Sequence, residues 1–372
     1  MIVASIYFHI PFCKRLCGYC DFYRSVKVKF IPQVVEAMHE ELATQHDFIG
    51  DKTVRTIYFG GGTPSLLAPS EIERFVEQVR VLFDCSQLEE VTIEVNPDDI
   101  TPDYVAELRK TSVNRISMGV QSLDDGALQF MGRRHSAGQA GEAVKMLQEA
   151  GYDNISVDLI FGVDGFGSES LANTLEGFLS MNVQHISAYH LTIEENTRFG
   201  RLLARGEMSE VEEERSEAEF LQVDNALTAA GFDHYEVSNY ALPGFRSKHN
   251  SSYWRGVEYL GIGPGAHSFN GAVRRWCEQS VEEYIGGVEY GSEELTEADR
   301  VNEYIMTSLR CVEGFSLNDF EAKFGREHRA DLECEVAKNS ELGLLVCDGD
   351  RVRIEAEKML VSDMVIESMM VL

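Results

Sequence analysis

The sequence contains no long hydrophobic run and little positive charge. No apolar stretch among its 372 residues approaches the roughly 20 residues of a transmembrane helix, which excludes a membrane-spanning protein. Residues 1–12 lack the basic start and the small-residue cleavage site of a signal peptide, so we expect a cytoplasmic protein. The 33 lysines and arginines face 62 aspartates and glutamates, a net charge of -29. Such a field repels phosphate backbones, so we expect no nucleic-acid binding.

Disulfide pairing is also not expected. The composition, 44% hydrophobic and 26% charged, is that of an ordinary globular chain of about two domains. In a reducing cytosol its eight cysteines should be metal ligands, catalysts or buried thiols. Three of them, Cys13, Cys17 and Cys20, crowd one loop. The others are scattered, and we predict that they are small buried hydrophobic residues: Cys85, Cys277, Cys311, Cys334 and Cys347.

Strands alternate with helices in the first half of the chain. The predicted strands cover residues 2–8, 54–59, 90–95, 114–118, 154–161 and 184–190, and the predicted helices 31–48, 69–83, 102–110, 124–131, 138–150 and 168–181. This alternation predicts an α/β fold with a parallel sheet and right-handed crossovers. Six strand–helix units fit a partial (β/α)6 TIM-like barrel, and an open doubly wound sheet gives the same pattern. In both folds ligands bind at the carboxyl ends of the strands.

The second half of the chain has a different pattern. An acidic stretch at residues 207–219 starts a predicted helix, whose dipole it complements. A compact helical module begins at Glu297, Ser316 and Asp319 resemble a capping box, and Asp348-Gly349 predicts a hairpin between residues 344–346 and 352–354. Helices followed by such a hairpin predict a smaller, α-rich, winged-helix-like C-terminal domain. We expect three parts: the barrel at 1–200, an α/β extension at 201–290 and the C-terminal domain at 291–372.

The cysteine loop carries the sharpest chemical signal. Cys13, Cys17 and Cys20 follow the first predicted strand with the spacing C-x3-C-x2-C. Three thiolates supply one ligand fewer than a structural zinc or an ordinary four-iron cluster needs, which leaves a coordination position open for a small molecule. A zinc site with His9 as the fourth ligand, or three ordinary thiols, would give the same spacing.

This loop resembles that of the radical S-adenosylmethionine superfamily, whose three cysteines hold a 4Fe-4S cluster. The resemblance implies that the open iron chelates S-adenosylmethionine, and Tyr19 occupies the aromatic position of the motif. The turn Gly60-Gly61-Gly62-Thr63-Pro64 resembles the superfamily's glycine turn, which implies that Gly61, Gly62 and Thr63 receive the amino group of that cofactor. Tight turns between strand and helix use the same residues for purely structural reasons.

Further polar residues near strand ends match the oxygen-independent coproporphyrinogen III oxidases and their relatives. By this resemblance Tyr7, Glu94, Gln121, Arg133 and Asp158 bind the methionine and adenosine parts of the cofactor. Carboxylates can accept hydrogen bonds from ribose hydroxyls, and arginine can pair with a carboxylate. Each of them could instead cap the following helix. The role assigned to Arg133 could equally belong to its neighbour Arg134. We assign none of these side chains a catalytic role.

One position separates two branches of these relatives. The decarboxylating oxidases carry a fourth cysteine two residues after the third, where this chain has Phe22. Cys20-Asp21-Phe22 and His249-Asn250-Ser251-Ser252-Tyr253-Trp254 instead resemble the HemW family of haem chaperones, the latter as its HNxxYW motif. The resemblance makes His249 a candidate haem ligand. The alternative is that His249 braces a loop around Trp254, and for His9, His190 and His267 a structural role is the default.

The resemblance implies haem as cargo, apoproteins that accept it, and an electron donor such as a flavodoxin or a ferredoxin. The protein could contact a membrane only peripherally, where it meets the apoprotein that receives the haem. Residues 14–29 carry a net charge of +4, a basic island beside the cysteine loop that we expect to attract an anionic ligand or an acidic electron donor. Two other functions stay open: a coproporphyrinogen III oxidase, and a zinc-binding interaction protein without redox chemistry.

Overall fold

A curved sheet forms the centre of the computed structural model, which describes residues 3–370. The first six strands are β1 (Ala4–Ile10), β2 (Val54–Gly61), β3 (Glu90–Val95), β4 (Arg115–Gln121), β5 (Ile155–Phe161) and β6 (His185–His190). They are parallel and lie side by side in chain order. This confirms the predicted α/β fold with a parallel sheet.

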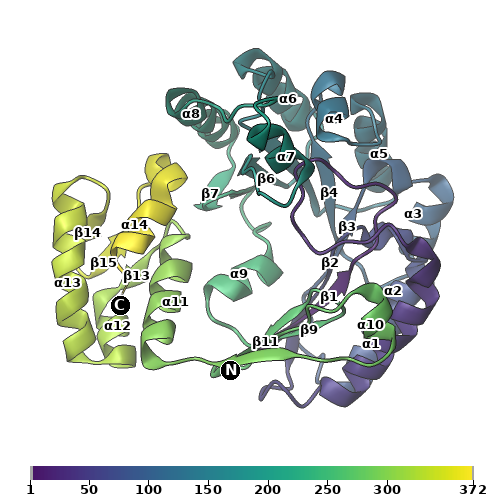
Figure 1. The fold of residues 1–372 in the computed structure, drawn as a ribbon, viewed down its shortest axis with the longest axis horizontal. Coiled ribbons are helices and arrows are strands. Elements are labelled where there is room, and N and C mark those ends of the chain that lie inside the picture. Colours follow the sequence, from purple (N-terminus) through teal and green to yellow (C-terminus); the bar gives the residue numbers. More distant parts are fainter. Residues whose placement is uncertain (1–2, 371–372) are drawn as a thin grey trace.

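Helices connect these strands. They are α1 (Ile31–Gln45), α2 (Pro69–Leu82), α3 (Pro102–Leu108), α4 (Asp125–Met131), α5 (Ala137–Glu149) and α6 (Ser168–Ser180), with short 3-10 turns at Val28–Phe30, Pro64–Leu66 and Pro97–Asp99. Figure 1 shows these helices around the outer side of the curved sheet. Parallel strands need such long crossovers, since a hairpin can join only antiparallel strands.

Later segments extend both edges of the sheet. At the β6 edge, β8 (Asn239–Ala241) and β7 (Asp233–Glu236) pair antiparallel. At the β1 edge, β9 (Tyr259–Ile262) adds a seventh parallel strand, followed by antiparallel β10 (His267–Phe269), β11 (Val273–Trp276) and β12 (Gly291–Glu294). The helices of this part are α7 (Arg198–Ala204), α8 (Glu213–Ala229), α9 (Lys248–Trp254) and α10 (Val281–Ile285). Within residues 3–370 the two edges, β12 and β7, do not pair, so the sheet stays open as in a partial barrel.

The C-terminal module stands beside this sheet. It contains α11 (Glu297–Leu309), β13 (Phe315–Ser316), α12 (Leu317–Phe324), α13 (Arg326–Glu341), β14 (Val346–Asp348), β15 (Arg351–Arg353), a 3-10 turn at Ala356–Val361 and α14 (Ser362–Ser368). The Ser316 side chain caps α12 by accepting from the Asp319 amide at 3.0 Å, and the predicted hairpin is β14–β15. Helices followed by this hairpin agree with the winged-helix-like prediction. No helix in the described part of the chain is long and apolar enough to cross a membrane.

The two faces of the sheet differ in chemistry because successive strand residues point to opposite sides. On the outer face Phe8 stacks on Phe59 with ring centroids 4.8 Å apart, and both pack against α2 through Phe75. The neighbouring positions Tyr7 and Tyr58, also paired in register, point to the inner face. The inner face therefore carries polar side chains over an apolar outer layer.

Candidate functional site

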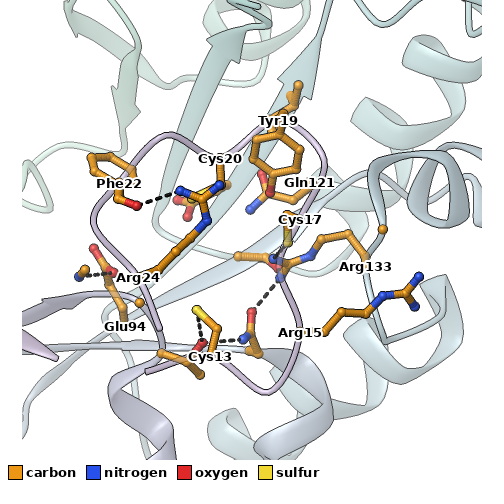
Figure 2. A pocket seen from close by; sticks show the side chains of 18 of the residues that line it. Cys13, Arg15, Cys17, Tyr19, Cys20, Phe22, Arg24, Glu94, Gln121 and Arg133 are labelled. Atoms are coloured by element: carbon orange, nitrogen blue, oxygen red, sulfur yellow. Dashed lines mark hydrogen bonds between the residues drawn. The ribbon is translucent and has the colours of Figure 1, made fainter. Parts of the chain in front are cut away.

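A pocket of about 380 Å³ lies at the carboxyl ends of the parallel strands. Eleven predicted site residues line it: Cys13, Cys17, Tyr19, Cys20, Gly61, Gly62, Thr63, Glu94, Gln121, Arg133 and Asp158. They come from five strands or their following loops, and Figure 2 shows the three cysteines around the same pocket as Arg133, Glu94 and Gln121, with Cys17 beside Arg133. The topology thus brings together residues up to 145 positions apart in sequence, from Cys13 to Asp158.

The cysteine loop is fixed at its base and at its tip. At the base, the Cys13 amide donates to the Ser25 carbonyl at 2.9 Å, and the Ser25 amide donates to the Pro11 carbonyl at 2.6 Å. At the tip, the Gly18 amide donates to Met131 at the end of α4, and the Phe199 amide donates to the Gly18 carbonyl, both at 2.9 Å. The loop is therefore anchored to the rest of the fold by backbone bonds that do not use the cysteine side chains.

A chain of hydrogen bonds joins two of the cysteines across the pocket. Thr63 Oγ1 donates to Cys13 Sγ at 3.5 Å, and Asn96 Nδ2 donates to Thr63 Oγ1 at 3.1 Å. Arg133 then donates from Nη2 to Asn96 Oδ1 at 2.6 Å and from Nη1 to Cys17 Sγ at 3.5 Å. Donors aimed at sulfur stabilise thiolate character, so this network suits cysteines that ligate a metal.

The glycine turn packs against the cysteine loop. A Cβ on Gly62 would stand 2.7 to 2.8 Å from backbone atoms of Ile10, Pro11 and Phe12, and Gly61 has φ of +102° and lies against the His9 ring. Only glycine fits at both positions. These two glycines are thus explained by the protein's own packing, and the Gly61 amide also donates to Glu94 Oε2 at 3.1 Å.

Two half-buried carboxylates line the pocket from the inner face of the sheet. Burial raises the pKa of Asp158 to about 7, with a further rise from Glu94, and Arg115 and Arg133 oppose the shift. Burial also raises the pKa of Glu94, which accepts from Tyr58 Oη at 2.8 Å. Both carboxylates thus stand in a site that favours their protonated forms until a cationic or hydrogen-bond-donating partner enters.

The donor set fits the cofactor expected from the sequence. Arg133 Nε is buried without a hydrogen-bond partner, while its two Nη atoms are engaged. Gln121 has a left-handed backbone with φ of 72°, which is uncommon for any residue other than glycine. Its side chain lines the pocket. The site thus offers an unpaired guanidinium donor from Arg133, the side-chain amide of Gln121 and two carboxylates. Together these groups can bind the carboxylate, ammonium and ribose groups of S-adenosylmethionine.

The two neighbouring arginines have different partners. Arg134 forms ion pairs with Asp98 at 2.6 Å and Asp99 at 3.5 Å, whereas Arg133 contacts Cys17 and Asn96. Lys14 also pairs with Asp99, at 2.5 Å. Both arginines line the pocket, but only Arg133 reaches the cysteine loop.

The geometry disfavours His9 as the fourth ligand of a zinc site. His9 Nδ1 bonds with Tyr7 Oη at 3.1 Å and Nε2 with the Tyr23 carbonyl at 2.9 Å, so both ring nitrogens are engaged. Among the described residues no three His, Cys, Asp or Glu side chains converge on a point where one metal ion would bind. A four-iron cluster places each cysteine on a different iron, so its ligands stand farther apart than the thiolates of one zinc ion.

Two predicted site residues lie outside this pocket. Tyr7 is half-buried and lines a second, larger cavity. His249 is buried on α9, where Nδ1 bonds with Thr56 Oγ1 at 2.8 Å and Nε2 with Tyr253 Oη at 2.9 Å. Burial lowers the pKa of His249 to about 3. Neither ring nitrogen is available to a ligand in this arrangement, which supports the bracing alternative.

Sequence reasoning did not single out Asn96 and Tyr189. Asn96 connects Thr63 with Arg133, and Tyr189 lines the pocket from the end of β6. Asn96 directly follows a predicted strand, so its position at a strand end was a usable signal. Tyr189 is the next-to-last residue of its strand, but the alternation alone does not say that it faces the pocket.

Known proteins resemble this chain over most of its length. Residues 7–177 match the radical SAM superfamily, and residues 295–361 match the HemN C-terminal domain. The chain is 36% identical to heme chaperone HemW of Lactococcus lactis, covering 86% of this chain and 85% of that protein, and 32% identical to HemW of Mycobacterium tuberculosis, covering 98% and 94%. The fold matches the solved structure of coproporphyrinogen III oxidase (HemN) from Escherichia coli with a TM-score of 0.84 and 21% identity, over 99% of this chain and 90% of that one.

Proposed function

The chain belongs to the HemW family of radical SAM proteins, and from this membership and the cysteine pocket we propose that it binds haem and transfers it to apoproteins. The observation that carries the proposal is the convergence of the three cysteines, the glycine turn and the strand-end polar residues in one pocket. Cys13, Cys17 and Cys20 would hold a 4Fe-4S cluster, and the polar residues of the same pocket would hold S-adenosylmethionine.

When bound, the cluster can supply one electron to S-adenosylmethionine. The protein's own contribution is to hold and shield this site. Thr63 and Arg133 orient Cys13 and Cys17, Arg133 Nε offers a donor to a carboxylate, and Glu94 and Asp158 offer acceptors. Tyr19 packs toward Phe199, which closes the wall at the tip of the loop.

The residue at position 22 argues against oxidase activity. Phe22 stands where the decarboxylating relatives have a fourth cysteine, and its side chain is 70% exposed at the mouth of the pocket. A phenyl group can neither ligate a metal nor transfer a proton. We therefore expect haem binding without decarboxylation of coproporphyrinogen.

The remaining partners follow from the same proposal. An electron donor such as a flavodoxin or a ferredoxin would reduce the cluster, and the reducing cytoplasm would keep the cysteines available as thiols. The recipient is a haem-requiring apoprotein.

Anaerobic reconstitution followed by parallel assays tests this function. The wild-type chain should take up iron and sulfide, bind ferric haem and pass it to an apoprotein, and show no coproporphyrinogen decarboxylation. Replacing Cys13, Cys17 and Cys20 by serine should abolish cluster uptake. Cys334 and Cys347 are exposed, so the prediction that they are buried was wrong. Replaced together by serine, they are the matched control and should leave cluster uptake unchanged. Sustained decarboxylation that depends on the three cysteines, or no binding of haem, would overturn the proposal.

A further inference from the structure

A second cavity, of about 1160 Å³, separates the sheet from the C-terminal module. One wall is the exposed face of β9, β10 and β11, the facing wall is α11, and the end of α9 closes one side. In Figure 1, α9 lies between the C-terminal module and the strands. Ligand pockets usually span about 300 to 1,000 Å³, so this cavity has room for a molecule as large as a tetrapyrrole.

Aromatic rings cover much of its surface. Tyr253 and Tyr259 pack edge to face with centroids 4.8 Å apart, and Phe269 follows at 6.1 Å. Trp254 and Tyr304 add rings from α9 and α11. Flat apolar walls of this kind suit a planar macrocycle.

The lining of the cavity is not acidic, although the whole chain is. Five arginine or lysine side chains and four aspartate or glutamate side chains line the cavity, whereas the whole chain has a net charge of -29. Arg274 already pairs with Glu303 at 2.5 Å, and Arg246 with Glu313 at 2.5 Å. Arg255, Arg300 and Lys323 form no ion pair with any described residue, but Lys323 lies over the Tyr304 ring, with Nζ 4.9 Å from its centroid. Arg255 and Arg300 therefore remain as the two cations for an anionic ligand.

The strand register points one imidazole into the cavity. His267 and Phe269 alternate with Ser268 on β10, and Ser268 Oγ points the other way, where it accepts from the Gly261 amide at 2.9 Å. No described residue forms a hydrogen bond with either ring nitrogen of His267, which leaves both open to a ligand. A neutral imidazole is the commonest metal ligand among side chains.

The other imidazole in the lining is engaged, and the two thiols and the Tyr253 phenol are protonated. Both His9 nitrogens have partners. Burial raises the pKa of Cys311 to about 12 and also raises the pKa of Cys277, so both remain thiols near neutral pH. Burial likewise raises the pKa of Tyr253 far above neutrality, which disfavours its phenolate.

The HNxxYW motif borders the same cavity through its aromatic end. His249 Nε2 bonds with Tyr253 Oη at 2.9 Å, and Tyr253 and Trp254 line the cavity whereas His249 does not. His249 is therefore a positioning residue that fixes Tyr253 in the wall.

We propose that this cavity is the haem site, in which an imidazole nitrogen of His267 ligates the iron and Arg255 and Arg300 pair with the two propionates. The inference rests on the proposed function, since it identifies where the haem of that function binds. The imidazole would supply one ligand to the haem iron, and the aromatic walls would cover the macrocycle.

Titration with ferric haem tests the ligand. In the full-length chain His267→Ala should move the Soret band and weaken haem binding at least tenfold, and added imidazole should restore the band. The control His46→Ala, on the end of α1 outside both pockets, should behave as wild type, and His249→Gln should keep the wild-type Soret position. An unchanged band and affinity in His267→Ala, or a shift caused by His249→Gln alone, would overturn the assignment. Absence of haem binding by the wild type would instead contradict the proposed function.

The arginines are tested by charge reversal. Arg255→Glu with Arg300→Glu should weaken haem binding about tenfold and leave binding of the haem dimethyl ester, which lacks the two carboxylates, unchanged. Lys110→Glu in the turn after α3, with Lys145→Glu on α5, makes the same change in net charge and should have no effect. Equal losses for haem and its ester, or for both charge reversals, would show that the two arginines do not bind the propionates. Thermal melting of each variant distinguishes these losses from unfolding.

Discussion

Asp158 is held in an environment that opposes its ionisation. It lies half-buried near Glu94, with Arg115 and Arg133 as the nearby cations and Ser187 as a hydrogen-bond partner. Because burial outweighs the two arginines, the folded protein retains a proton that the unfolded chain loses at lower pH. This residue thus lowers stability as pH rises from its ordinary pKa of 3.8 through the folded value of about 7.

Asp158→Asn should remove this pH dependence. The shift from 3.8 to about 7 corresponds to an upper limit of about 4 kcal/mol in the free energy of unfolding, at 1.36 kcal/mol per unit. The variant should therefore gain stability over wild type at pH 8 by a few kcal/mol, and the difference should vanish near pH 4. Urea unfolding at both pH values, without S-adenosylmethionine, measures it. Asp331→Asn, at an exposed position of α13, is the control, and a difference independent of pH would contradict the argument.

Single residues also show where sequence reasoning reached its limit. The resemblance to the radical S-adenosylmethionine superfamily predicted Cys13 and Arg133 in one site, and both line the pocket. The separate roles of Arg133 and Arg134 depend on Asp98 and Asn96, whose positions are fixed by a loop from another strand. Spacing along one segment cannot carry such information, because these contacts are set by tertiary packing.

The glycine turn and the cysteine loop are two elements in direct contact, and Gly62→Ala tests their fit. The new Cβ would meet three backbone atoms at 2.7 to 2.8 Å, which no side-chain rotation can relieve. We expect a loss of about 2 kcal/mol or more in stability and fewer irons per chain after reconstitution. Gly138→Ala in α5, where the nearest atom is 3.9 Å away, should be neutral or stabilising. Equal iron content in both variants would show that the loop tolerates displacement.

The basic island is partly neutralised by neighbouring elements. Lys14 pairs with Asp99, and Lys27 pairs with Glu282 at 2.5 Å. Arg15 and Lys29 form no ion pair with any described residue, so reversing the charges of these two side chains tests the basic island directly.

Arg15→Glu with Lys29→Glu should slow reduction of the cluster by an acidic electron donor about tenfold at low salt, and the effect should shrink at high salt because screening weakens charge steering. Stopped-flow reduction by flavodoxin measures the rate, and iron content verifies that the cluster is intact. Reversal of Lys110 and Lys145 is the control for net charge. Equal rates for both reversals would remove the island as the docking site.

Helices and strands that are specified by the sequence of their own segment were predicted well. Strands that form by pairing with a segment far away in the sequence were not predicted. Strand β3 was predicted at its observed bounds, and α2 ended one residue early relative to the prediction. Hydrophobic periodicity and turn residues specify these elements locally. In contrast, β9 returns to the β1 edge from about 250 residues away, and its four residues carry no pattern that names a partner strand. The cavity beside it could therefore not be predicted.

At the scale of the whole molecule, two cavities share one segment of the cysteine loop. Asp21 and Phe22 line both the cofactor pocket and the larger cavity. The loop is anchored at Ser25 and Gly18, and Phe22 between these anchors is 70% exposed. A ligand that orders this segment from one side thus organises a wall of the other cavity.

This shared wall predicts coupling between S-adenosylmethionine and haem. Binding of S-adenosylmethionine to the reconstituted protein should tighten haem binding roughly fivefold, because a preordered wall reduces the entropy lost on binding. Reciprocity requires haem to tighten S-adenosylmethionine binding by the same factor, and calorimetric titration in both orders measures the two effects. Phe22→Ala should reduce the coupling, while Leu342→Ala, an equally exposed apolar residue after α13, should preserve it. Affinities that do not depend on the order of addition or on the second ligand would show that the two cavities act independently despite their common segment.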